Sequence, residues 1–153
     1  MIATSTERPV AGGSGGARRF ELELPPSDVA ATVARSALRR VLDFIDDDRE
    51  SSFLVALTEI VTNAVDEHRR SAPGESLIVE VVLDGDPVVR VIDHGSGLDE
   101  LRRRATAATP PAPDDRAGRG LVLAQSFVPA LSFEVTSGGT TAVLPLSGFA
   151  RPR

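Results

Sequence analysis

A glycine-rich segment near the end of the chain has the residue types that bind phosphate. Gly118-Arg119-Gly120-Leu121 stands immediately before an apolar segment that predicts a helix. The free N–H groups and positive dipole end of a helix attract anions, and the Arg119 guanidinium can add charge-assisted hydrogen bonds. The segment is therefore a candidate phosphate site, although an ordinary glycine-rich start of a helix would have the same sequence.

A second candidate follows an apolar, β-branched segment. Residues 91–97 read Val-Ile-Asp-His-Gly-Ser-Gly, so a carboxylate, Asp93, stands where a strand is expected to end. Gly95 and Gly97 allow the backbone to approach a flat ligand closely. The Asp93 carboxylate can accept a hydrogen bond from an exocyclic amine in a half-buried pocket. A plain β-turn explains the same residues equally well.

A third candidate is a pair of polar residues within an apolar helical segment. Glu59 and Asn63 are four residues apart, which places both on one face of a helix. Asparagine is a poor residue in the interior of a helix, so its presence there indicates a function for its side chain. A solvated helix face is the alternative. A fourth candidate, Gly138-Gly139-Thr140-Thr141, precedes the last strand and is also typical of a hairpin turn.

Hydrophobic periodicity predicts the elements that hold these residues. Phe20, Leu22 and Leu24 alternate with glutamates as in a half-buried strand, and Ser27 or Asp28 is expected to cap the next helix. The expected elements then follow as a helix to about residue 45 with one apolar stripe (Val29, Val33, Ala37, Val41 and Phe44), a helix at about 50–69 that buries Phe53, Leu54, Leu57, Val61, Ala64 and Val65, strands at 76–83 and 88–92, a helix at 121–128, and strands at 131–136 and 141–146.

This order of elements indicates an α+β fold, a two-layer sandwich with a mostly antiparallel mixed sheet and helices packed on one face. At 153 residues, a single domain is expected. We assign it to residues 18–148, with residues 1–17 as a disordered N-terminal tail and 149–153 as a C-terminal tail. Residues 98–104 are expected to begin a short helix, and residues 106–117 show no periodicity.

Composition excludes several classes of function. The chain has no cysteine, and all 17 basic residues are arginine. Thiolate metal sites, cysteine nucleophiles, lysine Schiff bases and a Walker-type phosphate loop are thereby excluded. A net charge of −5 gives no electrostatic basis for direct nucleic-acid binding. The chain contains neither an apolar segment of membrane-spanning length nor a signal peptide, so we expect no membrane association and a cytoplasmic location.

Taken together, the four candidates resemble the GHKL (Bergerat-fold) ATPases. The shared order is Glu-x-x-x-Asn on a helix, Asp-x-Gly-x-Gly after a strand, a loop, Gly-x-Gly at the start of a helix and a late Gly-Thr. The resemblance covers roughly residues 20–146. The segment at residues 57–64, Leu-Thr-Glu-Ile-Val-Thr-Asn-Ala, is most similar to the anti-sigma-factor serine/threonine kinases of this superfamily.

The resemblance implies a role for each candidate residue and two cofactors, ATP and Mg²⁺. Glu59 would be the general base that accepts the proton of the attacking serine, and Asn63 would ligate Mg²⁺. Asp93 would bind the adenine amine with Thr140 nearby. The remaining implied roles are close approach to the base by Gly95 and Gly97, phosphate binding by Gly118, Arg119, Gly120 and Leu121, and a nucleotide-ordered lid formed by residues 98–117.

The chain departs from the serine-kinase pattern at one position. Members of that branch usually have His four residues after the Asn, whereas this chain has Glu67 there and His68 one residue later. A second carboxylate near the triphosphate would repel it unless Glu67 turns away, so this departure weighs against the kinase step rather than against ATP binding. His68 is interpreted as a packing or capping residue at the end of the helix.

The resemblance also implies protein partners. The leading interpretation is a serine/threonine kinase that binds a sigma factor, or a STAS-type antagonist that it phosphorylates, with a homodimer as a further expectation. A non-catalytic ATP/ADP-binding module that only sequesters a partner is the alternative, and an interaction domain without nucleotide is another. A sensor histidine kinase fragment is disfavoured because His94 lies inside the proposed nucleotide loop.

Overall fold

The computed structural model describes residues 4–7, 18–95, 116–136 and 138–151. These residues form a six-stranded sheet in which every neighbouring pair of strands is antiparallel. The strands lie across the sheet in the order β1 (Thr4–Glu7), β2 (Arg19–Leu24), β3 (Leu77–Val82), β4 (Val88–Asp93), β6 (Gly139–Pro145) and β5 (Ser132–Thr136).

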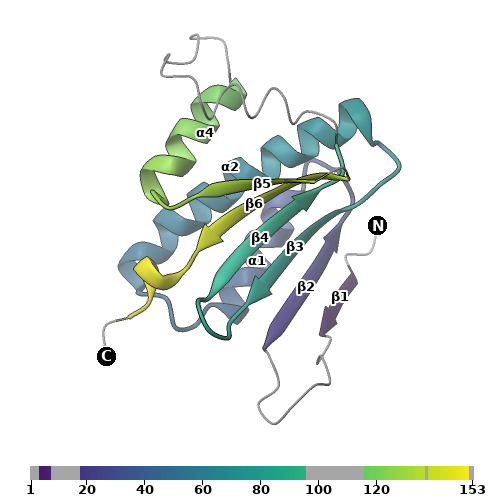
Figure 1. Ribbon diagram of the computed structural model, residues 1–153. Helices are drawn as coiled ribbons and strands as arrows, with labels where there is room; N and C mark the ends of the chain where they lie inside the picture. The colour runs from purple at the N-terminus through teal and green to yellow at the C-terminus, as the bar shows by residue number, and fades with distance from the viewer. Residues whose placement is uncertain (1–3, 8–17, 96–115, 137, 152–153) are drawn as a thin grey trace.

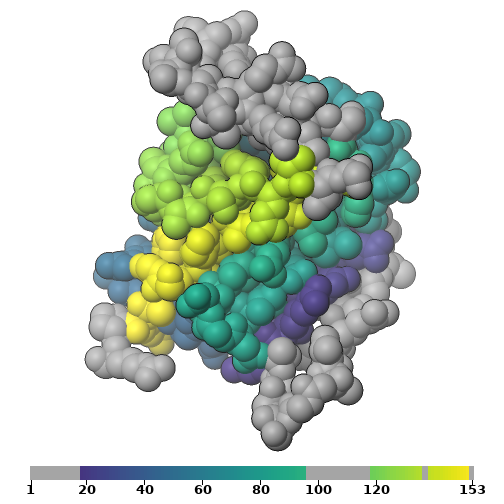
Figure 2. Space-filling view, viewed as in Figure 1, coloured from purple at the N-terminus to yellow at the C-terminus, as the bar shows by residue number. Residues whose placement is uncertain are grey.

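The helices gather on one face of this sheet (Figure 1). They are α1 (Ala30–Val41), α2 (Asp47–Ser71) and α4 (Arg116–Phe127), and α2 packs against both of the others. Figure 2 looks onto the opposite face, where the strands themselves form the surface. The expected two-layer α+β architecture with helices on one face is therefore confirmed.

The second helix is longer than the sequence predicted. Asp46 is its N-cap, and the Asp46 side chain accepts a hydrogen bond of 3.2 Å from the backbone N–H of Asp48. Asp46, Asp47 and Asp48 thus begin α2, because carboxylates stabilise the positive end of a helix. Arg69 and Arg70 stand in the last turn, where cations are favourable.

The first helix differs from its prediction in both its cap and its buried face. Its N-cap is Val29, and no side chain caps it, so the expected capping by Ser27 or Asp28 is wrong. Asp28 instead forms an ion pair of 2.7 Å with Arg69 of α2. The expected stripe is also displaced, since Val29 is 59% exposed while Ala30, Ala34 and Leu38 are buried. The two alanines allow α1 to lie close to its neighbours.

Two glycine segments expected in loops lie inside regular elements. Helix α4 begins at Arg116, so Gly118 and Arg119 belong to its first turn rather than preceding it. Strand β6 begins at Gly139, which places Thr140 opposite Asp93 in the β4–β6 ladder. Gly139 has a φ of +146°, a conformation that side chains rarely adopt. In both cases tertiary packing extends an element beyond its apolar pattern.

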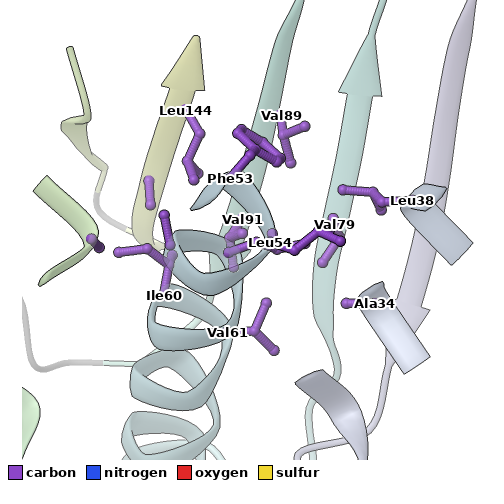
Figure 3. Close-up of a cluster of buried hydrophobic side chains, with 14 of the residues drawn as sticks. Ala34, Leu38, Phe53, Leu54, Ile60, Val61, Val79, Val89, Val91 and Leu144 are labelled. Carbon is purple, nitrogen blue, oxygen red and sulfur yellow. The ribbon is translucent and has the colours of Figure 1, made fainter. Parts of the chain in front are cut away.

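The core is formed where α2 crosses the sheet (Figure 3). The predicted buried side of this helix is confirmed, since all six expected residues are buried. Phe53, Leu54 and Val61 face Val79, Val89 and Val91 of the central strands, with Leu38 and Leu144 at the sides. With few aromatic residues in the chain, the core consists mainly of leucine, valine and alanine side chains.

Both ends of the chain contribute more structure than expected. Thr4–Glu7 form β1 along β2, although residues 1–17 were predicted to be disordered; the open edge of β2 offers backbone partners to any extended segment. Residues 149–153 were predicted as a tail, yet the Phe149 ring packs against Phe53 at 5.2 Å between centroids. The Arg151 guanidinium also donates to the Ile45 carbonyl at 3.0 Å.

The strand face away from the helices carries a buried charge. Glu80 of β3 is nearly inaccessible and forms ion pairs of 2.8 Å with Arg19 of β2 and 3.1 Å with Arg90 of β4. These cross-strand pairs compensate its desolvation. Among the described helices, none has the length and apolar character needed to cross a lipid bilayer.

Candidate functional site

Three polar residues form a row on α2. Glu59, Asn63 and Glu67 follow one another at intervals of four residues and therefore lie along one flank of the helix. Glu59 lies against α4, because a Cβ added at Gly120 would overlap its carboxylate oxygen Oε2. Glu67 lies against the segment after β4, because a Cβ added at Gly95 would overlap its Cγ. The helix thus faces one predicted glycine segment at each end of the row.

Asp93 ends β4 opposite this row. Its carboxylate accepts a hydrogen bond of 3.0 Å from the Gly95 N–H and a second from the backbone of Thr140. The residue is 7% exposed. Burial raises the pKa of Asp93 above its usual range, and the backbone hydrogen bonds offset only part of this effect. The side chain is therefore an oriented acceptor in a region of low polarity.

A small cavity lies between α2 and the strands that carry Asp93 and Thr140. It has a volume of about 20 Å³, and its polar lining comes from Asn63, Asp93 and Thr140. The rest of its lining is apolar and consists of Ile60, Ala64, Val91, Phe133 and Ala142. The volume is far below that of pockets for drug-sized ligands, so the cavity is too small to hold a planar base as it stands.

A larger cavity lies elsewhere. It has a volume of about 530 Å³ and lies between α1 and the strands β2 and β3, lined in part by Phe20, Leu38 and Val79. None of the residues predicted to bind nucleotide lines it. The larger cavity is therefore not the site that the sequence predicted. The small cavity is distinguished by its polar lining rather than by its volume.

Two groups of the row on α2 are available to a ligand. Within the part of the chain that the structure describes, neither the Glu59 carboxylate nor the Asn63 amide forms a hydrogen bond or ion pair. Asparagine inside a helix usually bonds to nearby backbone, so a half-buried amide that lacks such a bond is consistent with an external ligand.

Glu67, the residue that departs from the serine-kinase pattern, forms hydrogen bonds with side chains of its own helix. Its two carboxylate oxygens accept hydrogen bonds from Ser71 Oγ at 2.9 Å and from the Arg70 guanidinium at 3.1 Å. Its side chain is 13% exposed. The carboxylate is thus directed toward the end of α2 and partly neutralised, which weakens the repulsion expected between Glu67 and a triphosphate.

The remaining predicted residues lie in different surroundings. Gly97 and residues 98–115 of the expected lid fall outside the described residues. Arg119 is exposed on the first turn of α4, whereas Leu121 is 3% exposed and belongs to the core. Only the backbone of Leu121 is therefore able to face a ligand. Gly118 is buried in the same turn.

Sequence reasoning missed part of the role of His68. Its interpretation as a packing residue is confirmed, because the side chain is completely buried. Its Nε2 also accepts a hydrogen bond of 2.9 Å from the backbone N–H of His94, directly after Asp93. No local pattern predicts this bond, since the two residues meet only when the end of β4 packs on the end of α2.

Comparison with known proteins identifies relatives of this chain. Residues 24–145 match the family described as the histidine kinase-like ATPase domain. The chain is 28% identical over 116 residues to the anti-sigma F factor of Clostridium acetobutylicum, across 75% of this chain and 78% of that protein. It is 30% identical over 89 residues to the anti-sigma F factor of Caldanaerobacter subterraneus subsp. tengcongensis, across 58% of this chain and 62% of that protein.

A solved structure is also similar. The RsbU and RsbW domains of a Mycobacterium tuberculosis protein match 88% of this chain with a TM-score of 0.62 and 25% sequence identity. The match spans only 33% of that longer chain. The likeness therefore concerns one domain of that protein.

Proposed function

The chain belongs to the histidine kinase-like ATPase family, and on this premise we propose that it is an ATP-binding anti-sigma regulator that phosphorylates a protein antagonist on serine or threonine. The observation that carries the proposal is the row on α2. Glu59 and Asn63, one helical turn apart, have no hydrogen-bond partner among the described residues and face Gly120 on one side and Asp93 with Thr140 on the other.

In this proposal, the strand side of the site holds the base of ATP. The Asp93 carboxylate accepts a hydrogen bond from the exocyclic amine of adenine, and Thr140 lies beside it in β6. Gly95 allows the backbone to lie close to the ring. The phosphates lie toward the first turn of α4, where the positive end of the helix dipole and the exposed Arg119 guanidinium favour an anion.

The donor set fits a magnesium ion held mainly by nucleotide. Among the described residues, no cluster of three or more histidine or acidic side chains is able to hold a metal. The free Asn63 amide oxygen is a hard ligand that would bind Mg²⁺ together with phosphate oxygens and water. When bound, the ion neutralises charge on the phosphates. Asn63 then fixes the position of the triphosphate relative to Glu59.

Glu59 supplies the base for phosphoryl transfer in this proposal. Its carboxylate accepts the proton of the attacking hydroxyl while the hydroxyl oxygen bonds to the γ-phosphorus. The bond from the γ-phosphorus to the bridging oxygen breaks, and ADP leaves with that electron pair. Most of the catalytic effect then comes from positioning and charge neutralisation.

The names of the relatives support the choice of partner. Two of the similar proteins are anti-sigma F factors, so the proposed partners are a sigma factor and a STAS-type antagonist in the cytoplasm. The alternative, a module that binds ATP or ADP and acts only by sequestering its partner, predicts nucleotide binding without phosphotransfer. A homodimer remains part of the proposal.

A matched pair of substitutions on α2 tests this function. Glu59→Gln removes the base but keeps the shape, so transfer of ³²P from ATP to STAS-domain proteins of the host should fall by about 100-fold or more, while ATP affinity by calorimetry changes little. Asp66→Asn, on an exposed position of the same helix, serves as the control and should retain both. ATP binding without any wild-type phosphotransfer would support the sequestering module, and no ATP binding would exclude both.

A further inference from the structure

The imidazole of His68 connects three segments at one end of the central strands. It lies near the end of α2 and is completely buried. Its Nδ1 is 3.1 Å from the carbonyl oxygen of Glu75, in the turn before β3, and its Nε2 is 2.9 Å from the backbone nitrogen of His94. The C-terminal ends of α2 and β4 lie near each other in Figure 1.

The two partners determine the protonation of the ring. A backbone carbonyl only accepts, so Nδ1 must carry a hydrogen and donate it to Glu75. A backbone N–H only donates, so Nε2 must be unprotonated to accept from His94. His68 is therefore a neutral imidazole whose donor and acceptor are both used, and no other ring state satisfies both bonds.

The bond to His94 acts on the peptide group that follows Asp93. From the opposite side, Gly139 approaches the same peptide so closely that an added Cβ would overlap the Asp93 carbonyl oxygen. The peptide is thus fixed on one side by the His68 imidazole and on the other by β6. The next backbone N–H, that of Gly95, donates to the Asp93 carboxylate at 3.0 Å. Displacement of this peptide would turn the carboxylate away from the cavity.

We infer that His68 is a positioning residue for the nucleotide base: its neutral imidazole holds the peptide after Asp93 and thereby aims the Asp93 carboxylate at the exocyclic amine. This inference rests on the proposed function, because it concerns the adenine end of the same site. In this role His68 does not touch the ligand, and its effect should be confined to recognition of the base.

Three variants test the inference. His68→Leu removes both hydrogen bonds, whereas His68→Gln retains an acceptor and a donor on one side chain. Leu38→Ala removes buried apolar volume from α1, away from the site, and controls for general loss of stability. The probes are adenosine, for the base end, and inorganic tripolyphosphate, for the phosphate end, with dissociation constants measured by calorimetry at a temperature where every variant is folded.

The expected result is a selective loss. His68→Leu should weaken adenosine binding by about tenfold or more, because it leaves a buried donor without an acceptor, and should leave tripolyphosphate binding within about twofold. His68→Gln should restore most of the adenosine affinity, and Leu38→Ala should leave both affinities unchanged. Equal adenosine affinity in wild type and His68→Leu, or equal losses for both probes, would overturn the inference.

A readout without ligand separates this inference from the proposed function. Hydrogen exchange of the His94 amide should be slow in wild type and in His68→Gln, and at least about tenfold faster in His68→Leu. If wild type binds neither adenosine nor ATP, the proposed function fails, and with it the assignment to base recognition. Unchanged exchange of the His94 amide in His68→Leu would show instead that the imidazole does not hold this peptide.

Discussion

The two ends of the row on α2 differ in whether their polar groups have hydrogen-bond partners within the protein. At the β4 end, the Glu67 carboxylate, the Asp93 carboxylate and both nitrogens of His68 have hydrogen-bond partners within the protein. At the α4 end, the Glu59 carboxylate has none among the described residues. The first end is therefore held by hydrogen bonds within the protein, whereas the second leaves a half-buried carboxylate without one.

The glycines at the two ends show the same contrast. A Cβ added at Gly139 would meet backbone, the carbonyl of Asp93, and backbone there is fixed by the sheet. A Cβ added at Gly120 would meet only the end of the Glu59 side chain, which is able to rotate. A methyl group at the first position should therefore disturb the fold, and at the second it should disturb the proposed chemistry.

Of the two glycine substitutions, Gly120→Ala should have the larger effect on activity. The methyl group forces the Glu59 carboxylate to move, and misplacement of a catalytic group by about 1 Å costs roughly 100-fold in rate. Stability should rise by about 0.5–1 kcal/mol, because alanine is the better helix residue. Phosphotransfer assays and urea unfolding measure the two effects. Full activity in Gly120→Ala would show that the position of Glu59 does not matter.

Gly139→Ala should have the largest effect on stability. The φ of +146° is strained for alanine, and the overlap with the Asp93 carbonyl adds to the cost. We expect the free energy of unfolding to fall by about 2–3 kcal/mol in urea titrations. Gly74→Ala is the control, since nothing lies within 4 Å of its added Cβ. Equal stability of the two variants would contradict the contrast between the two ends.

The pH dependence of base binding should be the smallest effect. Because burial raises the pKa of Asp93, the carboxylate takes up its proton at a higher pH than an exposed aspartate does. In the proposed site, adenosine binding uses the ionised form as acceptor, so affinity should decrease as the pH falls through this raised pKa, by up to about tenfold per pH unit.

The unliganded protein should respond to this titration in the opposite direction. A carboxyl whose folded pKa exceeds its unfolded value binds more protons when folded, so the contribution of Asp93 to stability increases as the pH falls through the same interval. Asp93→Asn should abolish both dependences. Persistence of the pH-dependent adenosine affinity in Asp93→Asn would assign it to another group.

Much of the architecture was predictable because it depends on local pattern. The alternation in β2 and the apolar side of α2 determine which faces are buried, and the order of elements determines the two layers. Element ends were predicted less well. Asp46 caps α2 and Arg116 begins α4 because of charge and packing that the apolar periodicity does not contain.

The candidate site also contains features that local pattern predicts and features that it does not. Glu59 and Asn63 share a flank by helical geometry alone, and Asp93 ends its strand where the pattern ends. The contacts of Glu67 with Ser71 and Arg70, and of His68 with His94, were not predictable. The first depends on a choice among rotamers, and the second joins residues that are 26 positions apart.

One unbroken helix carries Glu59, Asn63 and Glu67. The axial interval between successive members is therefore about 6 Å and is independent of any neighbouring side chain. Substitutions elsewhere can shift or tilt the whole row but cannot alter its spacing. In the proposed site, a variant selected to accept a different purine would have to acquire its changes in the strands opposite, around Asp93 and Thr140, while the half of α2 proposed to face the phosphates stayed as it is.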